Sequence, residues 1–265
     1  MQFAALTGIL LGYRTLRGFT GILPGYRTLR GLKPATTKAR EPSVPNPKVC
    51  AICGFGNATT RDHVPPKGMF PLPLPVKLIT VPACSKCNNG AATQDERFRV
   101  YLSMATSYSN TDATRLWKER TSRTLGKNAA LKREIFASVQ AGQAAAPGHH
   151  GTPFFWPVSA YSPVLERMAR GLYWHHYGSA LGNRAECKVD FLYSLPSEID
   201  EIMIDWNQGY VGNDQFVYRY ASVLEEPLRT AWIFQFFNSH WGCVETFPAG
   251  GVPLKELRHS PPVTP

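Results

Sequence analysis

The sequence has no apolar run of the ~18 residues that a membrane-spanning helix needs. Its start, MQFAALTGILLGY, is mildly apolar, but it lacks a basic first region and an evident small-residue cleavage site. From these absences we expect neither a membrane protein nor a secretory signal. A cytoplasmic location follows as the expectation.

Cysteine is scarce, with six residues in a chain of 265. Four of them form two Cys-x-x-Cys pairs, Cys50/Cys53 and Cys84/Cys87. Without a secretory signal, such paired spacing favours a metal site over disulfide bonds. Each pair supplies two thiolates from one tight turn, and two pairs complete a tetrahedron. The spacing therefore predicts a structural zinc ion with no open position for chemistry.

Acidic side chains are few in the part of the chain that carries these pairs. Residues 49–133 contain 13 Lys and Arg against 5 Asp and Glu, whereas residues 134–265 contain 8 against 13. A basic segment suits a polyanionic partner such as nucleic acid. A solvated, basic helical face explains the same charge equally well. The candidates for phosphate contacts are Arg61, Lys67, Lys86, Arg115, Lys118, Arg120 and Arg123.

Residues 1–48 offer no pattern of burial. The stretch TGILLGYRTLRG at 7–18 recurs as TGILPGYRTLRG at 20–31, and a Pro- and Lys-rich stretch follows. We interpret residues 1–48 as a disordered repeat and linker. A start assigned too far upstream would account for the duplication, and a basic arm that touches phosphates is the alternative.

The rest of the chain predicts an α+β protein. Residues 49–110 are expected to form a module with strands at 58–64 and 76–82 and a helix at 85–108. Residues 111–145 are expected to be a basic helical segment that is capped by Thr111 or Asp112 and breaks near Gly126. Residues 146–265 are expected to form an α+β domain of unknown role. It would contain an amphipathic helix at 162–181 and an antiparallel sheet from runs at 187–195, 201–206, 216–223 and 229–247.

Asp62 and His63 lie between the two cysteine pairs, and Asn88 directly follows the last cysteine. A metal shared by both pairs would hold the strand at 58–64 against the start of the helix. Asp62 and Asn88 offer hard oxygens that suit Mg²⁺ or Mn²⁺. Neighbouring strand side chains point to opposite faces, so His63 can face water instead.

Two structural alternatives stay open for these residues. His63 can be a structural imidazole tied to a backbone carbonyl, and Asn88 can simply cap the helix. For the acids that follow, Asp95 and Glu96, we expect surface salt bridges with Arg61, Arg97 or Arg99. The alternative is that they bind the catalytic ion or support its ligands.

The combination of Cys-x-x-Cys, Asp-His with a nearby proline, and Cys-x-x-Cys-Asn resembles the HNH (ββα-metal) endonuclease superfamily. It is closest to the zinc-bearing subtype typified by the phage Holliday-junction resolvase, and it covers residues 50–98. The resemblance implies a zinc-stabilised, treble-clef-like ββα-metal module that hydrolyses DNA phosphodiester bonds. By this resemblance Cys50, Cys53, Cys84 and Cys87 hold zinc.

The same resemblance implies the catalytic roles. Asp62 and Asn88 would hold a Mg²⁺ or Mn²⁺ ion, and His63 would be the general base that takes a proton from the attacking water. The family often has a further Asn a few residues before the second cysteine pair. The stretch VKLITVPAC at 76–84 has none, and Thr80 or a backbone group is expected to replace it.

Two other functions are compatible with the sequence. A zinc-stabilised nucleic-acid-binding module without cleavage activity needs the same cysteines but no catalytic ion. An adaptor would bind a protein partner through its acidic C-terminal part.

Overall fold

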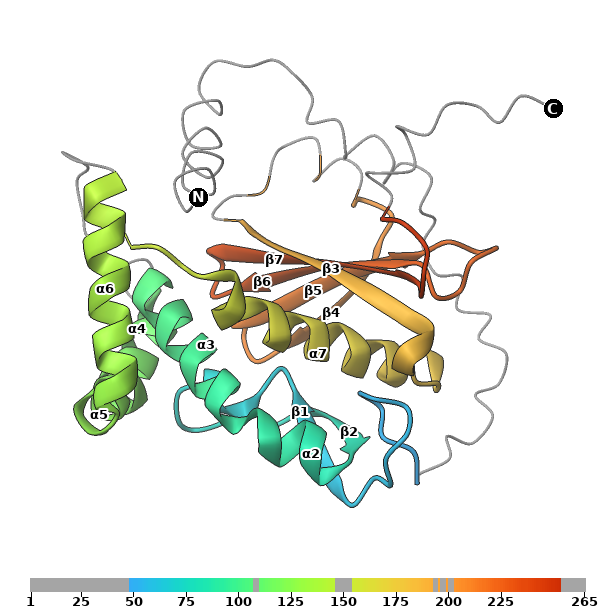
Figure 1. Cartoon of the computed structure of the whole chain (residues 1–265), viewed down its shortest axis with the longest axis horizontal. Coiled ribbons are helices and arrows are strands. Elements are labelled where there is room, and N and C mark those ends of the chain that lie inside the picture. Colours follow the sequence, from blue (N-terminus) through green and yellow to red (C-terminus); the bar gives the residue numbers. More distant parts are fainter. Residues whose placement is uncertain are drawn as a thin grey trace, which may run out of the picture.

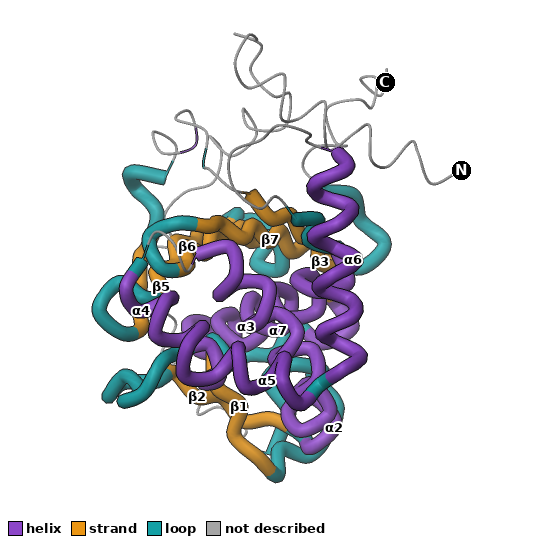
Figure 2. The backbone as a smooth tube through the Cα atoms, turned by 90° about the vertical axis from the view of Figure 1, so that its left-hand side faces the viewer, coloured by secondary structure: helices purple, strands orange, loops and turns teal. Residues whose placement is uncertain are grey.

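The computed structural model describes residues 48–106, 110–145, 154–192, 195, 199 and 203–253. The repeat at 7–31 and the linker up to residue 47 lie outside these residues. The described elements stack in three layers (Figures 1 and 2). A five-stranded antiparallel sheet forms one outer layer, helices α3 and α7 form the middle, and a two-stranded hairpin forms the third. The predicted α+β class is confirmed.

The hairpin contains the first two strands of the described residues. Strand β1 (Thr60–Val64) pairs antiparallel with β2 (Ile79–Ala83), and the short 3-10 helix η2 (Lys67–Met69) lies in the loop between them. Next come α2 (Ser85–Asn88), the 3-10 turn η3 (Asn89–Ala91) and α3 (Ala92–Thr106). The predicted strands are confirmed with slightly later starts. The predicted helix is confirmed too, but it is interrupted at η3.

A run of helices follows: α4 (Thr111–Leu116), the π-helical turn η4 (Trp117–Thr121), α5 (Ser122–Lys127) and α6 (Ala129–Ala145). The predicted break near Gly126 occurs at Asn128, whose backbone leaves the helical region. The predicted cap is wrong by one residue. Asn110 is extended, and its side chain accepts hydrogen bonds from the N–H groups of Asp112 and Ala113.

The last part comprises α7 (Val158–Tyr177), the turn η5 (Gly182–Arg184) and the five-stranded sheet in the order β3-β7-β6-β5-β4. Its strands are β3 (Ala185–Leu192), β4 (Asn207–Val211), β5 (Phe216–Ser222), β6 (Thr230–Phe236) and β7 (His240–Pro248). The predicted antiparallel sheet is therefore confirmed.

The predicted strand at 201–206 is wrong in its described part. Residues 203–206 form turns, and β4 starts only at Asn207. Ile199, Met203 and Trp206 are all buried in one cluster against the sheet. Their spacing of four and three residues is that of a helical turn, and the N–H of Met203 donates to the carbonyl of Ile199. The apolar residues of this segment therefore have the spacing of a helical turn and not that of a strand.

The core runs through all three layers. One hydrophobic cluster joins Ile52 and Val64 near the hairpin, Phe98 of α3, Leu172 of α7 and Trp232 of the sheet. The predicted segments 49–110 and 146–265 therefore share a core. Six of the seven β6 residues are buried, because α7 covers one face of the sheet and the cluster around Met203 covers the other.

The contact between α7 and the hairpin is close because α7 carries a glycine there. A Cβ on Gly171 would lie 2.6 Å from Cγ2 of Val64, and 3.6 Å from both Ile52 and Val81.

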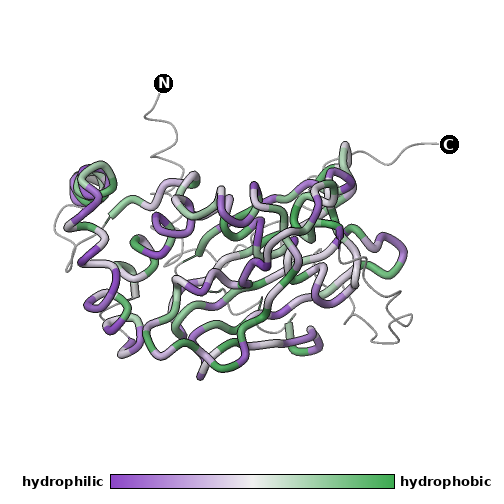
Figure 3. Tube along the Cα trace, turned by 90° about the horizontal axis from the view of Figure 1, so that it is seen from below, coloured by the Kyte–Doolittle hydropathy of each residue, from purple (hydrophilic) through white to green (hydrophobic). Residues whose placement is uncertain are grey.

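Among the described residues, no helix is both long enough and apolar enough to cross a membrane. Hydrophilic and hydrophobic positions alternate along the helices in Figure 3.

Candidate functional site

The four paired cysteines converge on one point. Their sulfur atoms all lie within 4.8 Å of one another. A tetrahedral zinc site with Zn–S bonds of about 2.3 Å places its sulfurs about 3.8 Å apart. The cluster can therefore hold a metal ion and is compatible with structural zinc, as the spacing predicted.

Local backbone geometry builds each half of the cluster. In the first half, the N–H of Gly54 donates to the carbonyl of Cys50, and the N–H of Cys50 donates to the carbonyl of Gly56, both at 2.9 Å. In the second half, Cys84 precedes α2 and Cys87 lies within it. Gly56 allows the halves to meet, since a Cβ there would stand 2.9 Å from Cβ of Cys84.

The peptide groups around the first turn favour a thiolate at Cys53. Burial works against ionisation, but hydrogen bonds from the backbone at Gly56 and Phe55 outweigh it and lower the pKa of Cys53 to about 7. Burial raises the pKa of Cys50 and of Cys87. Four closely spaced sulfurs cannot all ionise without a cation, which is the electrostatic condition that a bound metal satisfies.

Asn88 ties the cysteine cluster to β1. Its side-chain Nδ2 donates to Oγ1 of Thr60 at 3.1 Å and to the carbonyl of Arg61 at 3.0 Å. The alternative in which Asn88 caps a helix is wrong: Cys84 precedes α2, and Asn88 makes no side-chain cap bond to η3. With Nδ2 facing β1, the amide carbonyl of Asn88 is left for another ligand.

The side chain of Asp62, in β1, is buried and belongs to a network of ion pairs. Its Oδ1 accepts the backbone N–H of His63 at 2.8 Å, and its Oδ2 lies 3.1 Å from Nε of Arg167. Arg167, on α7, also pairs with Asp95 on α3. Burial raises the pKa of Asp62, and the charge of Arg167 opposes that rise. The expected surface pairing of Asp95 with Arg61, Arg97 or Arg99 is wrong, because α7 packs on α3 and brings Arg167 to it.

Arg167 is not among the site residues predicted from the sequence. The signal was present, since Arg167 lies on the face of α7 that carries the buried Val164, Leu165 and Met168. The side chain of Arg167 is only 7% exposed. An arginine on an apolar helix face requires a buried acidic partner.

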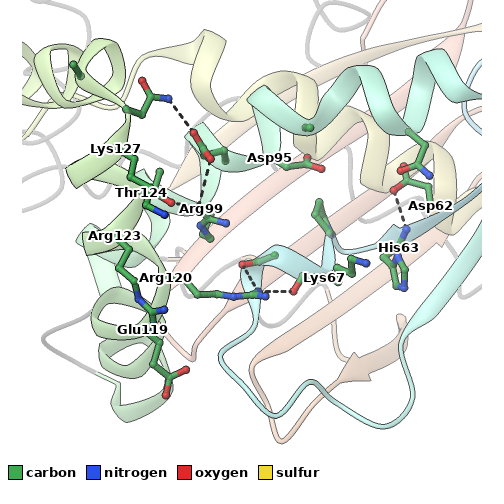
Figure 4. Close-up of a pocket in the computed structure, with 17 residues that line it drawn as sticks. Asp62, His63, Lys67, Asp95, Arg99, Glu119, Arg120, Arg123, Thr124 and Lys127 are labelled. Carbon is green, nitrogen blue, oxygen red and sulfur yellow. Dashed lines mark hydrogen bonds and ion pairs between the residues drawn. The ribbon is translucent and has the colours of Figure 1, made fainter.

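His63, Asp62 and Asn88 line the same cavity, which has a volume of about 880 Å³. Figure 4 draws Asp62 and His63 at one end of it, joined by the bond from the His63 backbone. Burial lowers the pKa of His63, and the nearby charge of Lys67 adds to this effect. Thr80 lies directly opposite His63 in the β1–β2 ladder, where cross-strand side chains are neighbours.

The predicted phosphate-contact residues fall into three groups. Lys67, Arg120 and Arg123 line the cavity with the Asp62–His63 pair. Lys86 lines a separate cavity of about 740 Å³, and Arg61 and Lys118 are exposed elsewhere. Arg115 is committed to contacts within the chain, with Asp112, Glu119 and the carbonyl of Leu72. Arg99 and Lys127 also line the first cavity, although they are not among the predicted phosphate contacts.

Comparisons with protein-family models, with curated proteins and with solved structures found no match. Every functional statement about this chain therefore depends on its own residues and their geometry.

Proposed function

We propose that this protein is a metal-dependent endonuclease of the HNH type, which hydrolyses phosphodiester bonds in DNA. The observation that carries the proposal is the convergence of His63, Asp62 and Asn88 on one cavity beside a cluster of four cysteines. The order of hairpin and helix around that cluster is the one that a ββα-metal module requires.

In this proposal Cys50, Cys53, Cys84 and Cys87 bind zinc, which has a structural role only. The two cysteine turns flank β1 in the sequence, so the metal fixes β1 against α2. Asn88 adds a direct link through its bonds to Thr60 and Arg61. The pieces of the site are thus held in place before any substrate binds, which reduces the reorganisation required during catalysis.

His63 is the general base. Its lowered pKa keeps the imidazole neutral near pH 7, so a ring nitrogen can accept a proton from the attacking water. Thr80, which lies opposite His63 in the β1–β2 ladder, would take the place of the family's further Asn.

The carboxylate of Asp62 and the side-chain carbonyl of Asn88 would hold Mg²⁺ or Mn²⁺. When bound, such an ion stabilises the charge that develops on the scissile phosphate and on the leaving oxygen. Asp62 must share its carboxylate with Arg167, since the two lie 3.1 Å apart. Arg167 therefore sets the direction in which the remaining lone pairs of Asp62 point.

The test is a cleavage panel on plasmid and branched DNA, with Mg²⁺, Mn²⁺ or Zn²⁺ and with a chelator. We expect nicking that requires Mg²⁺ or Mn²⁺ and that is lost in His63→Ala, while the zinc content of the variant stays unchanged. His175→Ala is the matched control, because His175 does not line the cavity. Equal activity in His63→Ala and in the unsubstituted protein would contradict the proposal.

A second candidate is a zinc-stabilised module that binds nucleic acid without cleaving it. Two observations favour it: the stretch 76–84 lacks an Asn, and Arg167 already neutralises Asp62. It predicts salt-sensitive DNA binding and no turnover with any divalent ion in the same panel.

A further inference from the structure

The cavity has a basic end that the proposed hydrolysis does not use. Figure 4 shows Arg99, Arg120, Arg123 and Lys127 across the cavity from Asp62 and His63, with Lys67 between the two ends. These cations come from different elements: Arg99 from α3, Arg120 from η4, and Arg123 and Lys127 from α5. The helices after the hairpin therefore line this end of the cavity with positively charged side chains.

The acids that line the cavity do not cancel this charge. Asp62 and Asp95 are already paired with Arg167. Glu119 lies 3.6 Å from Arg115, which is outside the lining. Glu96 approaches Arg99 only to 3.9 Å, and it accepts a hydrogen bond from Asn128. The basic end therefore keeps a net positive charge.

Arg99 shows the clearest need for an anion. Its side chain is only 14% exposed, and its Nη2 donates to the neutral hydroxyl of Thr124 at 2.6 Å. Its Nε is buried and has no hydrogen-bond partner among the described residues. Burial lowers the pKa of Arg99, the nearby charge of Arg120 lowers it further, and the carboxylates of Glu96 and Asp95 oppose this shift. Glu96 is 3.9 Å from the guanidinium, so a second anion that faces it more closely would offset more of the cost of its burial.

Arg120 is placed for the same role. Its Nη1 donates to the carbonyls of Lys67, Gly68 and Phe70, which fixes the guanidinium against the loop around η2. Those partners are neutral, and no carboxylate in the described part of the chain pairs with Arg120, Arg123 or Lys127 within salt-bridge distance. A held guanidinium has already lost much of its side-chain freedom, so it binds an anion at low entropic cost.

We propose that the basic end binds the backbone phosphate next to the scissile phosphate, on the same DNA strand. This inference rests on the proposed function, because the Asp62–His63 end is taken as the place of the scissile phosphate. A DNA strand presents one phosphate per nucleotide, so it can fill both ends of one cavity, which a single small anion cannot do. The guanidinium groups of Arg99 and Arg120 match the geometry of phosphate oxygens.

The first arm of the test measures binding without any catalytic ion. A fluorescent thymidine oligonucleotide is titrated against the full chain over a range of NaCl concentrations, in buffer without added divalent ions. We expect Arg123→Gln and Arg99→Gln each to weaken binding severalfold and to reduce the slope of log K against log salt by about 0.7. Arg133→Gln, at an exposed position of α6 outside the cavity, is the matched control and should change neither.

Arg99→Lys is the control for a loss of folding in Arg99→Gln, because it keeps the positive charge. It should keep the salt slope and lose part of the affinity. Arg123 is exposed, so its substitution tests the same subsite without disturbing the core. Wild-type affinity and slope in both Gln variants would overturn the subsite.

The second arm measures cleavage of a strand that carries a neutral methylphosphonate next to the scissile phosphate. For the unsubstituted protein we expect a raised KM with this strand, and for Arg99→Gln no further increase, since the contact is already lost. The two arms separate the proposals. If no ion supports cleavage but the Arg-dependent binding remains, the nuclease proposal fails and the subsite stands. If cleavage proceeds but neither the methylphosphonate nor the Gln variants matter, the subsite fails alone.

Discussion

Gly171 of α7 lies directly against Val64 of β1, so closely that a Cβ on Gly171 would stand 2.6 Å from Val64 Cγ2. Through this contact the last residue of β1, two positions after Asp62, is seated on the C-terminal half of the chain. The candidate site therefore depends on residues more than a hundred positions away in the sequence.

Gly171→Ala should destabilise the protein. Helix propensity alone predicts a gain of about 1 kcal/mol for this change in α7, but the overlap with Val64 should cost about 1–3 kcal/mol. Gly126→Ala in α5 is the matched control, because nothing lies within 4 Å of its Cβ position. Thermal unfolding should show a lower Tm for Gly171→Ala and an unchanged or higher Tm for Gly126→Ala. A higher Tm for both would show that the contact can relax.

Arg167→Met should destabilise the protein by about 3–5 kcal/mol, because it leaves the Asp62 and Asp95 carboxylates without their shared cation. Adding Asp62→Asn and Asp95→Asn should recover part of that loss, since the buried negative charge is then gone. The measurement is urea unfolding of the single and triple variants. Arg133→Met on the exposed face of α6 should stay within about 0.5 kcal/mol of the unsubstituted protein.

Removal of the metal should unfold the hairpin region. One zinc ion per chain is expected by elemental analysis, and structural zinc sites of this kind contribute about 10–16 kcal/mol of apparent binding free energy. Cys87→Ser should lose the zinc and the cooperative unfolding transition. Cys187→Ala, outside the cluster, should keep one zinc per chain. Full zinc occupancy in Cys87→Ser would contradict the four-cysteine site.

Acid should weaken the fold between about pH 6.5 and pH 4, in part through His176. Its two ring nitrogens lie 3.0 Å from the hydroxyls of Tyr218 and Tyr220. Burial, aided by the charge of His175, lowers the pKa of His176 to about 4. The unfolded chain, with an ordinary histidine pKa of about 6.5, binds more protons in this window. The free energy of unfolding therefore rises with pH and is lost as the pH falls.

The check is urea unfolding at several pH values for the unsubstituted protein and for His176→Phe. The free energy of unfolding of the variant should change less with pH between pH 6.5 and 4, whatever its stability at pH 7. Protonation of the cysteine thiolates contributes equally to both proteins and cancels in the comparison. An identical slope for the two proteins would show that His176 is not buried as a neutral side chain.

Short-range patterns made part of the site predictable. The two Cys-x-x-Cys pairs and the residue after the last cysteine each depend on a single turn of backbone, so their spacing alone indicated the cluster. Likewise, alternation in the strands and helical spacing in α7 follow from local geometry. The turns at 203–206 were misread because three apolar residues suit a strand or a helical turn in so short a segment.

Long-range contacts were not predictable. Arg167 is 72 positions from Asp95, and no local spacing links the two. The same holds for Arg99 with Thr124, 25 positions apart. These pairs form only because α7 and α5 pack where they do, and that packing is decided by the whole core.

The glycine contact at α7 also limits how this protein can be divided. A fragment that keeps residues 49–110 alone would expose Ile52 of the first cysteine turn and Val64 and Val81 of the hairpin, all of which lie against Gly171. It would also lose the only arginine seen to pair with Asp62 in the described part of the chain. A fusion protein that carries the cysteine-bearing segment would therefore have to include α7 as well.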